Sequence, residues 1–192
     1  APADVVFAAG QGKKYESQLP SKVRVEGTST LHAWTVDGQI IVGTLDVDPA
    51  FAISSLQPGK IKAQATVRIP VRTLKSGNKM MDDIMYRQMK MTQHRDITYR
   101  LTEWTLKETP SPAGPAQGEA AGLLIVSGVT NAITMPVTLE SAASGKLLIK
   151  GSANLKMTDF DIAPPELTLG VTPIKTGNEV KVSFEWLLAP KT

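Results

Sequence analysis

Apolar and polar residues alternate with a period of two along most of the chain, the pattern of β-strands that cover one face. Residues 146–157 show it most clearly: every second position from Leu147 to Met157 is apolar or small, and Lys, Ser and Asn occupy most of the positions between. The same alternation marks residues 22–28, 36–47, 61–69, 132–140 and 180–188. Short turns with Gly or Asn separate several of these segments, so they predict neighbouring strands of an antiparallel sheet.

Two further segments predict strands with irregularities. In residues 96–106 the apolar positions shift by one residue, which predicts a β-bulge near Thr102–Glu103. In residues 121–129 apolar side chains occupy both faces, which predicts a strand that is covered on both sides. Pro136 has no N–H to donate to a ladder, so it predicts an edge or a bulge. In total about eight long strands are expected.

One segment, residues 78–92, has a helical period instead. It holds five of the seven methionines of the chain. At about 100° per residue, its apolar residues cover about half of the helix circumference and its charged residues cover the other half. The apolar residues are Met80, Met81, Ile84, Met85, Met89 and Met91. Because methionine suits irregular or adaptable contacts, the pattern predicts a helix that covers or docks against another part of the molecule.

Small residues on the apolar strand faces bear on whether a barrel would be filled or hollow. Gly or Ala stands at positions 43, 63, 65, 151 and 153. An eight-stranded barrel is just wide enough to be filled by its own side chains or to hold one ligand. Small inward residues favour the ligand. The alternative is that Trp34, Trp104 and Trp186 lie over these positions and fill the barrel.

Composition narrows the class of protein. The chain has 192 residues, 42% of them hydrophobic, which suits one packed domain over residues 1–192 with its core at about 17–188. Residues 108–120 are rich in Pro, Gly and Ala and predict a mobile hairpin loop. No apolar run reaches the length of a membrane span. The net charge of +3 is scattered and 5% of the residues are aromatic, which argues against nucleic acid binding.

The chain contains no cysteine, so disulfides, thiolate metal sites and cysteine nucleophiles are excluded. The segment Ala1-Pro2-Ala3-Asp4 resembles the terminus that signal-peptide cleavage leaves. Together these features favour an exported protein.

Four blocks, in order along the chain, resemble the YceI family. They are the Gly27-Thr28-Ser29-Thr30-Leu31-His32-Ala33-Trp34 stretch within residues 21–43, Ile69-Pro70-Val71-Arg72-Thr73-Leu74-Lys75-Ser76-Gly77-Asn78, the hairpin at residues 122–133, and Gly177-Asn178-Glu179-Val180-Lys181-Val182. The resemblance spans roughly residues 17 to 188.

The resemblance implies an all-β fold: a single extended eight-stranded antiparallel barrel of lipocalin type, with one or two short helices near the barrel opening. Members of the family are mostly exported bacterial proteins, so a periplasmic or secreted location is expected. Some carry a long isoprenoid or another amphiphilic chain inside the barrel. The family has no accepted catalytic residues, and the chain is therefore expected to bind or transport such a molecule without being an enzyme.

The expected partner is accordingly a hydrophobic small molecule or lipid, with no cofactor beyond that bound chain, no protein metal site, and a possible homodimer. Polar groups near Ser29, His32, Arg72 and Arg95 are candidates to hold a head group at one end. The candidate ligand-binding residues are Leu31, His32, Trp34, Ile41, Ala63, Ala65, Met81, Ile84, Met85, Met89, Trp104 and Trp186.

Two alternatives remain open at this point. One is a filled barrel that serves as a protein-interaction or stress-response module. A copper site is the other, because thioethers suit Cu(I) and Met81, Met85 and Met89 share a helix near His94. Catalysis is the least supported class: the sequence has neither a nucleophile-elbow motif nor a phosphate-binding glycine loop.

Overall fold

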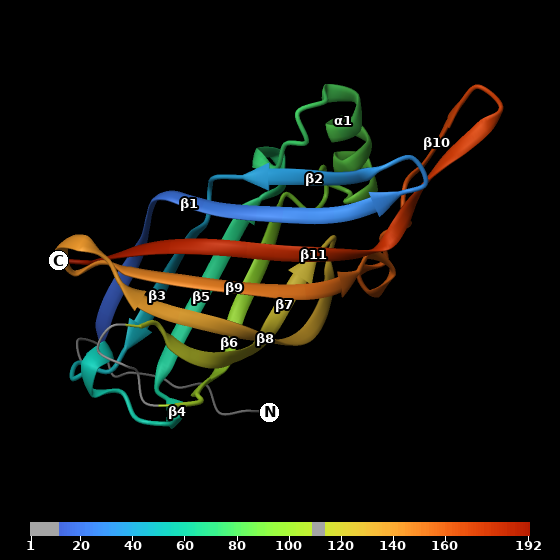
Figure 1. The fold of residues 1–192 in the computed structure, drawn as a ribbon. Coiled ribbons are helices and arrows are strands. Elements are labelled where there is room, and N and C mark those ends of the chain that lie inside the picture. The colour runs from blue at the N-terminus through green and yellow to red at the C-terminus, as the bar shows by residue number, and fades with distance from the viewer. Residues whose placement is uncertain (1–11, 109–113) are drawn as a thin grey trace.

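The computed structural model describes residues 12–108 and 114–192 and shows an antiparallel sheet that closes on itself as a barrel (Figure 1). The barrel closes because β11 pairs with β1 as well as with β9. Eight strands form the ring: β1 (Lys13–Ser29), β3 (Val42–Val47), β5 (Ala63–Pro70), β6 (Asp96–Leu106), β7 (Ala116–Val126), β8 (Val129–Ser141), β9 (Leu147–Lys156) and β11 (Thr172–Pro190). The predicted eight-stranded barrel is confirmed.

The other elements of residues 12–108 and 114–192 lie beside this ring. They are β2 (Ala33–Gly38), β4 (Gly59–Ile61), β10 (Glu166–Leu169), one α-helix, α1 (Lys79–Gln88), and four short 3-10 helices, η1 (Ile53–Ser55), η2 (Val71–Thr73), η3 (Ala143–Gly145) and η4 (Met157–Phe160). The hairpin of β10 with the start of β11 extends away from the barrel body (Figure 1). Within the described residues, none of the helices has the length and apolar character that a membrane crossing demands.

The longest strand, β1, changes its neighbour along its length. Its first residues pair with β3, and residues 23–28 pair with β2. The register against β11 shifts between Gln18 and Lys22. The buried Ser21 satisfies the backbone there: its hydroxyl donates to the Gln18 carbonyl (2.9 Å) and accepts from the Leu187 N–H (3.2 Å). The expected strand at residues 36–47 is divided, because the chain leaves β2 at Gly38 and re-enters the sheet at Val42.

Both predicted sheet irregularities are confirmed. The register between β6 and β7 shifts between Leu101 and Glu103, where the sequence predicts a bulge. The pairing of β8 with β9 runs from Val137 to Ser141. Pro136 is therefore the last residue of the part of β8 that pairs with β7 alone. A residue without an N–H is tolerated at such an edge.

Two expectations for the β7 region were wrong. The expected loop at 108–120 is too long: residues 116–120 belong to β7, and Ala116 and Ala120 are buried. The residues at the start of β7 are small residues that alternate with Gln and Glu, a composition that resembles a loop although it forms a strand. The expected strand at 121–129 is also too long, because Ser127 and Gly128 form a turn with positive φ, and the Ile125 side chain is exposed rather than covered. Residues 109–113 of the loop lie outside the described residues.

The helix is shorter than its apolar pattern. Asn78 caps it by accepting a hydrogen bond from the Met81 N–H (3.1 Å), which satisfies one of the free donors of the first turn. The helix ends at Gln88, and Lys90 then takes a left-handed conformation with φ of 55°. Met91 therefore lies beyond the helix, in the turns that lead to β6.

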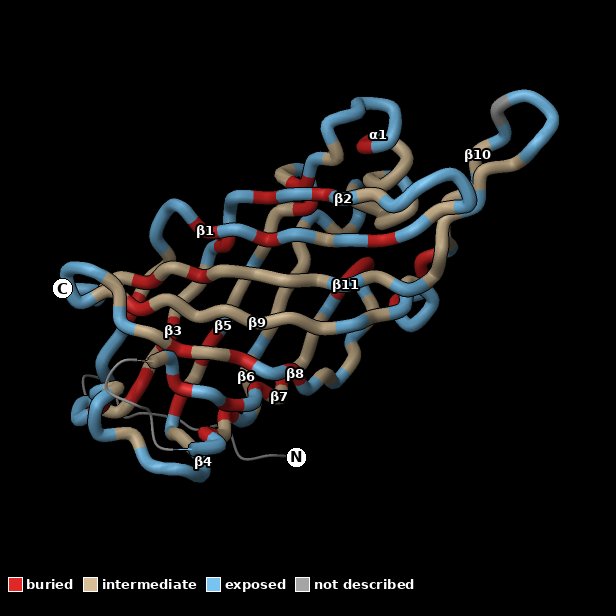
Figure 2. Tube along the Cα trace, in the orientation of Figure 1, coloured by how far each residue is buried: buried red, intermediate tan, exposed pale blue. Residues whose placement is uncertain are grey.

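Buried and exposed positions alternate along the strands (Figure 2), and the barrel has two unlike ends. We call the half that surrounds Leu45, Val47, Leu139 and Leu188 the packed end, since these side chains are at most 2% exposed. We call the other half, where α1, η2 and η4 lie, the helix end. Its apolar residues divide into two smaller clusters, one of Val23, Val36 and Leu74 and one of Val126, Phe160 and Ile162.

Candidate ligand-binding cavity

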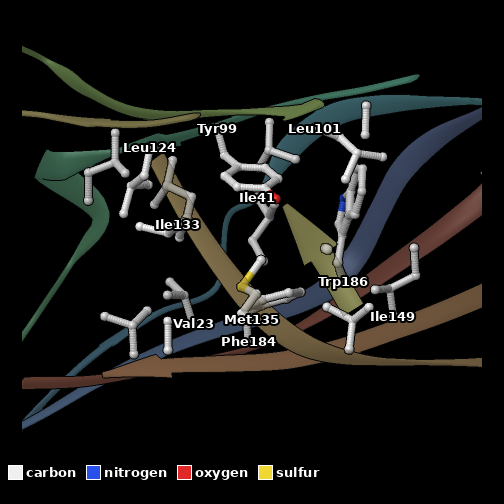
Figure 3. Close-up of a pocket in the computed structure, with 18 of the residues that line it drawn as sticks. Val23, Ile41, Tyr99, Leu101, Leu124, Ile133, Met135, Ile149, Phe184 and Trp186 are labelled. Carbon is white, nitrogen blue, oxygen red and sulfur yellow. The ribbon is translucent and has the colours of Figure 1, made fainter. Parts of the chain in front are cut away.

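An apolar cavity of about 180 Å³ lies inside the barrel, between the packed end and the helix end (Figure 3). Each of the eight ring strands contributes at least one of its 24 lining side chains. These residues face inward because they occupy alternate positions of their strands, such as Ile133, Met135 and Val137 of β8. None of the 24 is charged, so the wall can offer an occupant apolar surface and very few polar contacts.

Two lining side chains, Trp186 and Tyr99, carry polar atoms, and neither polar atom is exposed to the cavity. The Trp186 indole N–H donates to the Ser17 hydroxyl (2.7 Å), which donates in turn to the Gly43 carbonyl (3.1 Å). The polar atom of Trp186 is thus satisfied within the barrel wall. The Tyr99 hydroxyl is buried and has no hydrogen-bond partner among the described residues. Burial raises the pKa of Tyr99 to about 12, since removal from water disfavours the phenolate.

The small inward residues have two different roles. Gly122 and Gly151 are overlain by aromatic rings, because a Cβ at these positions would collide with Tyr99 and Phe184 respectively. Ala65, Ala120 and Ala153 instead line the open space. The barrel is therefore hollow beside these alanines, whereas aromatic rings occupy the space beside the two glycines.

The barrel wall is split in two places at the helix end. One seam lies between β8 and β9, because residues 129–136 and 152–156 extend beyond the ladder that joins these strands. The other lies between β2 and β5, where the segment 71–75 is inserted and Asp37 and Lys75 exchange two backbone hydrogen bonds of 2.8 Å. Both seams are covered by the elements that follow.

The seam beside β2 is covered by η2 and α1. The buried Asp82 carboxylate accepts two hydrogen bonds of 2.7 Å, from the N–H and the hydroxyl of Ser76. The Tyr86 hydroxyl donates to the Leu74 carbonyl (2.7 Å), which places Leu74 under the helix and against the cavity. Met85 packs on the same cluster.

The seam between β8 and β9 is covered by η4, which buries Phe160 and Ile162 against Val126. Two asparagines hold it in place. The Asn131 amide donates to the Asp159 carbonyl (2.6 Å), and Asn178 exchanges two hydrogen bonds with Thr158 (2.8 and 3.0 Å). The helix end is thus closed by two short segments, which are held by these hydrogen bonds and by buried apolar side chains such as Leu74 and Phe160.

A family model described as a YceI-like domain matches residues 17–187. The chain belongs to the YceI family. No curated protein sequence matches it. Its membership of the YceI family agrees with the barrel topology and with the four sequence blocks.

Several solved structures have the same fold as this chain. BcnA of Burkholderia cenocepacia superposes with a TM-score of 0.64 at 19% identity, covering 88% of this chain and 96% of that one. A polyisoprenoid binding domain from Saccharophagus degradans, implicated in plant cell wall breakdown, gives a TM-score of 0.65 at 12% identity and covers 92% and 98%. The YceI protein of Campylobacter jejuni gives 0.59 at 16% identity and covers 82% and 84%.

The candidate residues of this YceI chain fall into three groups. Four line the cavity, namely Ile41, Ala65, Trp104 and Trp186. Ala63 is buried in the packed end beside them. The other seven, Leu31, His32, Trp34, Met81, Ile84, Met85 and Met89, lie outside the lining. That any of the twelve binds a ligand stays a prediction.

The helix methionines are separated from the cavity by other side chains. Met85 packs on the cluster of Leu74, and Met89 packs on the cluster of Phe160. Met81 is 37% exposed. Leu74 and Val126, which are the core residues of these clusters, line the cavity in their place. Met85 and Met89 therefore back the cavity wall at different clusters, whereas Met80 and Met81 of the same helix are exposed.

The turn that carries Leu31 and His32 is exposed, with Leu31 at 66%. The Ser29 hydroxyl is used within this turn, donating to the His32 carbonyl (2.8 Å). Trp34 lies over Gly27 and donates to the Thr28 carbonyl (3.0 Å), so it packs on β1.

Tyr99, Met135 and Phe184 line the cavity, but the sequence-based list omits them. The signal was present, because all three occupy alternating apolar positions of predicted strands. Alternation identifies the inward face of a strand but not the level at which the barrel is open.

Proposed function

We propose that the protein binds an apolar or amphiphilic chain of isoprenoid type inside the barrel and carries it without chemical change. The observation that supports this most strongly is the apolar cavity of about 180 Å³ inside the barrel. An engineered apolar cavity of about 150 Å³ remains dry and binds benzene. Burial of each CH₂ contributes about 0.8 kcal/mol, so a chain gains affinity in proportion to the length that enters.

The size of the cavity also bears on how a long chain would be held. In the closed barrel there is room for a short section of chain near Met135, Trp186 and Tyr99. A longer section would have to displace side chains toward the helix end, where the apolar residues are less completely buried. The Saccharophagus degradans domain, described as polyisoprenoid binding, has the same fold and supports this class of ligand.

A carrier role is preferred over catalysis. The 24 described lining residues contain no carboxylate, histidine or lysine, and acid–base catalysis most often uses one of these groups within reach of the reacting atoms. We also propose an extracytoplasmic location, periplasmic or secreted, which membership of the YceI family supports. Cell fractionation of the native host tests the location directly.

The binding proposal is tested with delipidated protein and a short isoprenoid alcohol such as geraniol. Trp104 and Trp186 line the cavity, so their fluorescence reports entry. Ala153→Phe places a ring in the cavity and should abolish uptake. Ala132→Phe, at an exposed position of β8, is the matched control and should bind like the wild type.

Native mass spectrometry of the protein before delipidation should show an added lipid-like mass in the wild type and not in Ala153→Phe. The same spectra report whether the protein is a homodimer. A wild-type protein that carries no such mass and takes up no isoprenoid would overturn the proposal, and would favour a filled interaction module.

A further inference from the structure

The cavity reaches the seam between β8 and β9 at the helix end. The ladder that joins these two strands does not include residues 129–136 of β8 or residues 152–156 of β9. Both unpaired stretches nevertheless contribute to the cavity wall, through Ile133 on β8 (Figure 3) and Leu155 on β9. The elements that cover this seam from outside therefore also close the cavity at this point.

The aromatic side chain that covers the seam is Phe160 of η4. It is 3% exposed and forms one buried cluster with Val126 and Ile162. Leu155 packs against the same cluster, and both Val126 and Leu155 line the cavity. The ring of Phe160 therefore lies one layer of side chains outside the cavity, and its displacement would lengthen the apolar space.

The segment that carries Phe160 is joined to the barrel mainly through side chains. The N–H groups of Asp161 and Ile162 donate to carbonyls of the same segment (3.2 and 3.1 Å). The described hydrogen bonds to neighbouring elements use the side chains of Asn131, Asn178 and Lys90. Such a segment can move outward without breaking a ladder, so the main cost of opening is exposure of its buried apolar side chains.

The other seam, beside β2, is closed more tightly. Asp37 and Lys75 join the inserted segment to β2 through two backbone hydrogen bonds of 2.8 Å. Val71 and Leu74 of that segment are 1% and 2% exposed, and α1 covers them. An occupant of this seam would have to break backbone pairing as well as core packing. Of the two seams, the one under η4 is therefore the easier to open.

We infer that the seam between β8 and β9 is a second part of the ligand site, in which the outer section of a long chain displaces Phe160 and lies beneath η4. This inference rests on the proposed function and deepens it, because it names where a chain too long for the cavity is held. The added length of apolar chain is buried in place of the ring, which offsets the cost of moving η4. The segment η4 then acts as a lid that short chains leave closed and long chains open.

The test fastens the lid and compares two probes, geraniol and the longer geranylgeraniol. The chain has no cysteine, so Thr158→Cys with Asn178→Cys introduces its only thiols, at side chains whose polar atoms lie 2.8 Å apart. A short bis-methanethiosulfonate reagent joins the two thiols, and a reductant releases them. The joined protein should bind geranylgeraniol at least about tenfold more weakly relative to geraniol, because Phe160 cannot move aside. The reductant should reverse this loss.

The matched control joins two thiols at the packed end. Glu16→Cys with Lys191→Cys replaces an ion pair of 2.9 Å, and the same reagent should leave the ratio of the two affinities unchanged.

Removal of the ring gives a second measurement. Phe160→Ala should raise the affinity for geranylgeraniol relative to geraniol by at least about tenfold, whereas Phe51→Ala, which truncates a buried ring at the packed end, should not. A wider cavity alone would also raise this ratio, so the joined protein decides. If its ratio equals that of the wild type, or if the wild type binds geraniol but not geranylgeraniol, the inference is overturned and the carrier role remains. Failure of the wild type to bind either alcohol would instead overturn the proposed function.

Discussion

The two ends of the barrel are built from the same strands but are closed in different ways. At the packed end the ladders continue around the ring, and side chains such as Leu139, Leu188 and Val47 are at most 1% exposed. At the helix end the ladder is interrupted at two seams, and inserted segments cover them. Many apolar side chains there, including Met85 and Leu155, are only partly buried.

This difference indicates that the two ends of the barrel have different roles. Continuous ladders with complete burial provide stability, and the cavity begins where that packing stops. A seam that is covered by short inserted segments can open at lower free energy than a continuous ladder. If a chain enters the barrel, we expect it to enter at the helix end.

The largest expected effect comes from truncating a leucine at each end. Leu188→Ala at the packed end should lower the free energy of unfolding by about 3–5 kcal/mol, because a fully buried side chain leaves a void. Leu155→Ala, on neighbouring β9, already borders the cavity and should cost about 1–2 kcal/mol. Urea denaturation measures both. Equal losses would contradict the difference in packing between the ends.

The second prediction concerns alkaline pH and the layer between the two ends. The pKa of Tyr99 is about 12 in the fold and about 10 in the unfolded chain. Below pH ~10 both states keep the proton, so stability is unaffected. Between these values the unfolded chain releases its proton first, and stability falls as pH rises, by about 2–3 kcal/mol in total.

Other groups also titrate in this range, so the measurement is a difference. Free energies of unfolding of wild type and Tyr99→Phe are compared from neutral pH to pH ~12. The wild type should lose stability faster. Parallel curves would mean that Tyr99 ionises freely and that its hydroxyl is not in an apolar environment.

Much of this architecture follows from local patterns in the sequence. The alternation in residues 132–140 and 146–157 identifies the faces that line the cavity, and the phase shift at Thr102–Glu103 identifies the bulge. Both predictions are correct because backbone geometry fixes the direction of each side chain in a strand. The methionine pattern likewise locates the helix, although its end at Gln88 depends on the left-handed Lys90.

The details of the site could not be predicted in the same way. Whether Gly151 opens the barrel or is filled by Phe184 depends on contacts between strands distant in sequence. The position of the seam between β8 and β9 depends on where their ladder ends, and the alternation of apolar residues does not determine that point. The methionines were expected to touch cargo, but the inserted Leu74 lies between Met85 and the cavity, and its role depends on the Asp37–Lys75 pairing.

The smallest expected effect concerns the polar contacts that hold α1 over the helix end. Asp82→Ala removes the acceptor of two 2.7 Å hydrogen bonds from Ser76 and should lower the free energy of unfolding by about 1–2 kcal/mol. Its neighbour Asp83 pairs with Lys79 at an exposed i,i+4 position, so Asp83→Ala is the matched control and should cost at most about 0.5 kcal/mol. Since the loss at Asp82 is local, amide hydrogen exchange in α1 should accelerate while that around Leu139 of β8 stays unchanged. If Asp82→Ala costs no more than Asp83→Ala, this contact does not hold the helix end. If exchange accelerates equally at both ends, the two ends unfold as one unit.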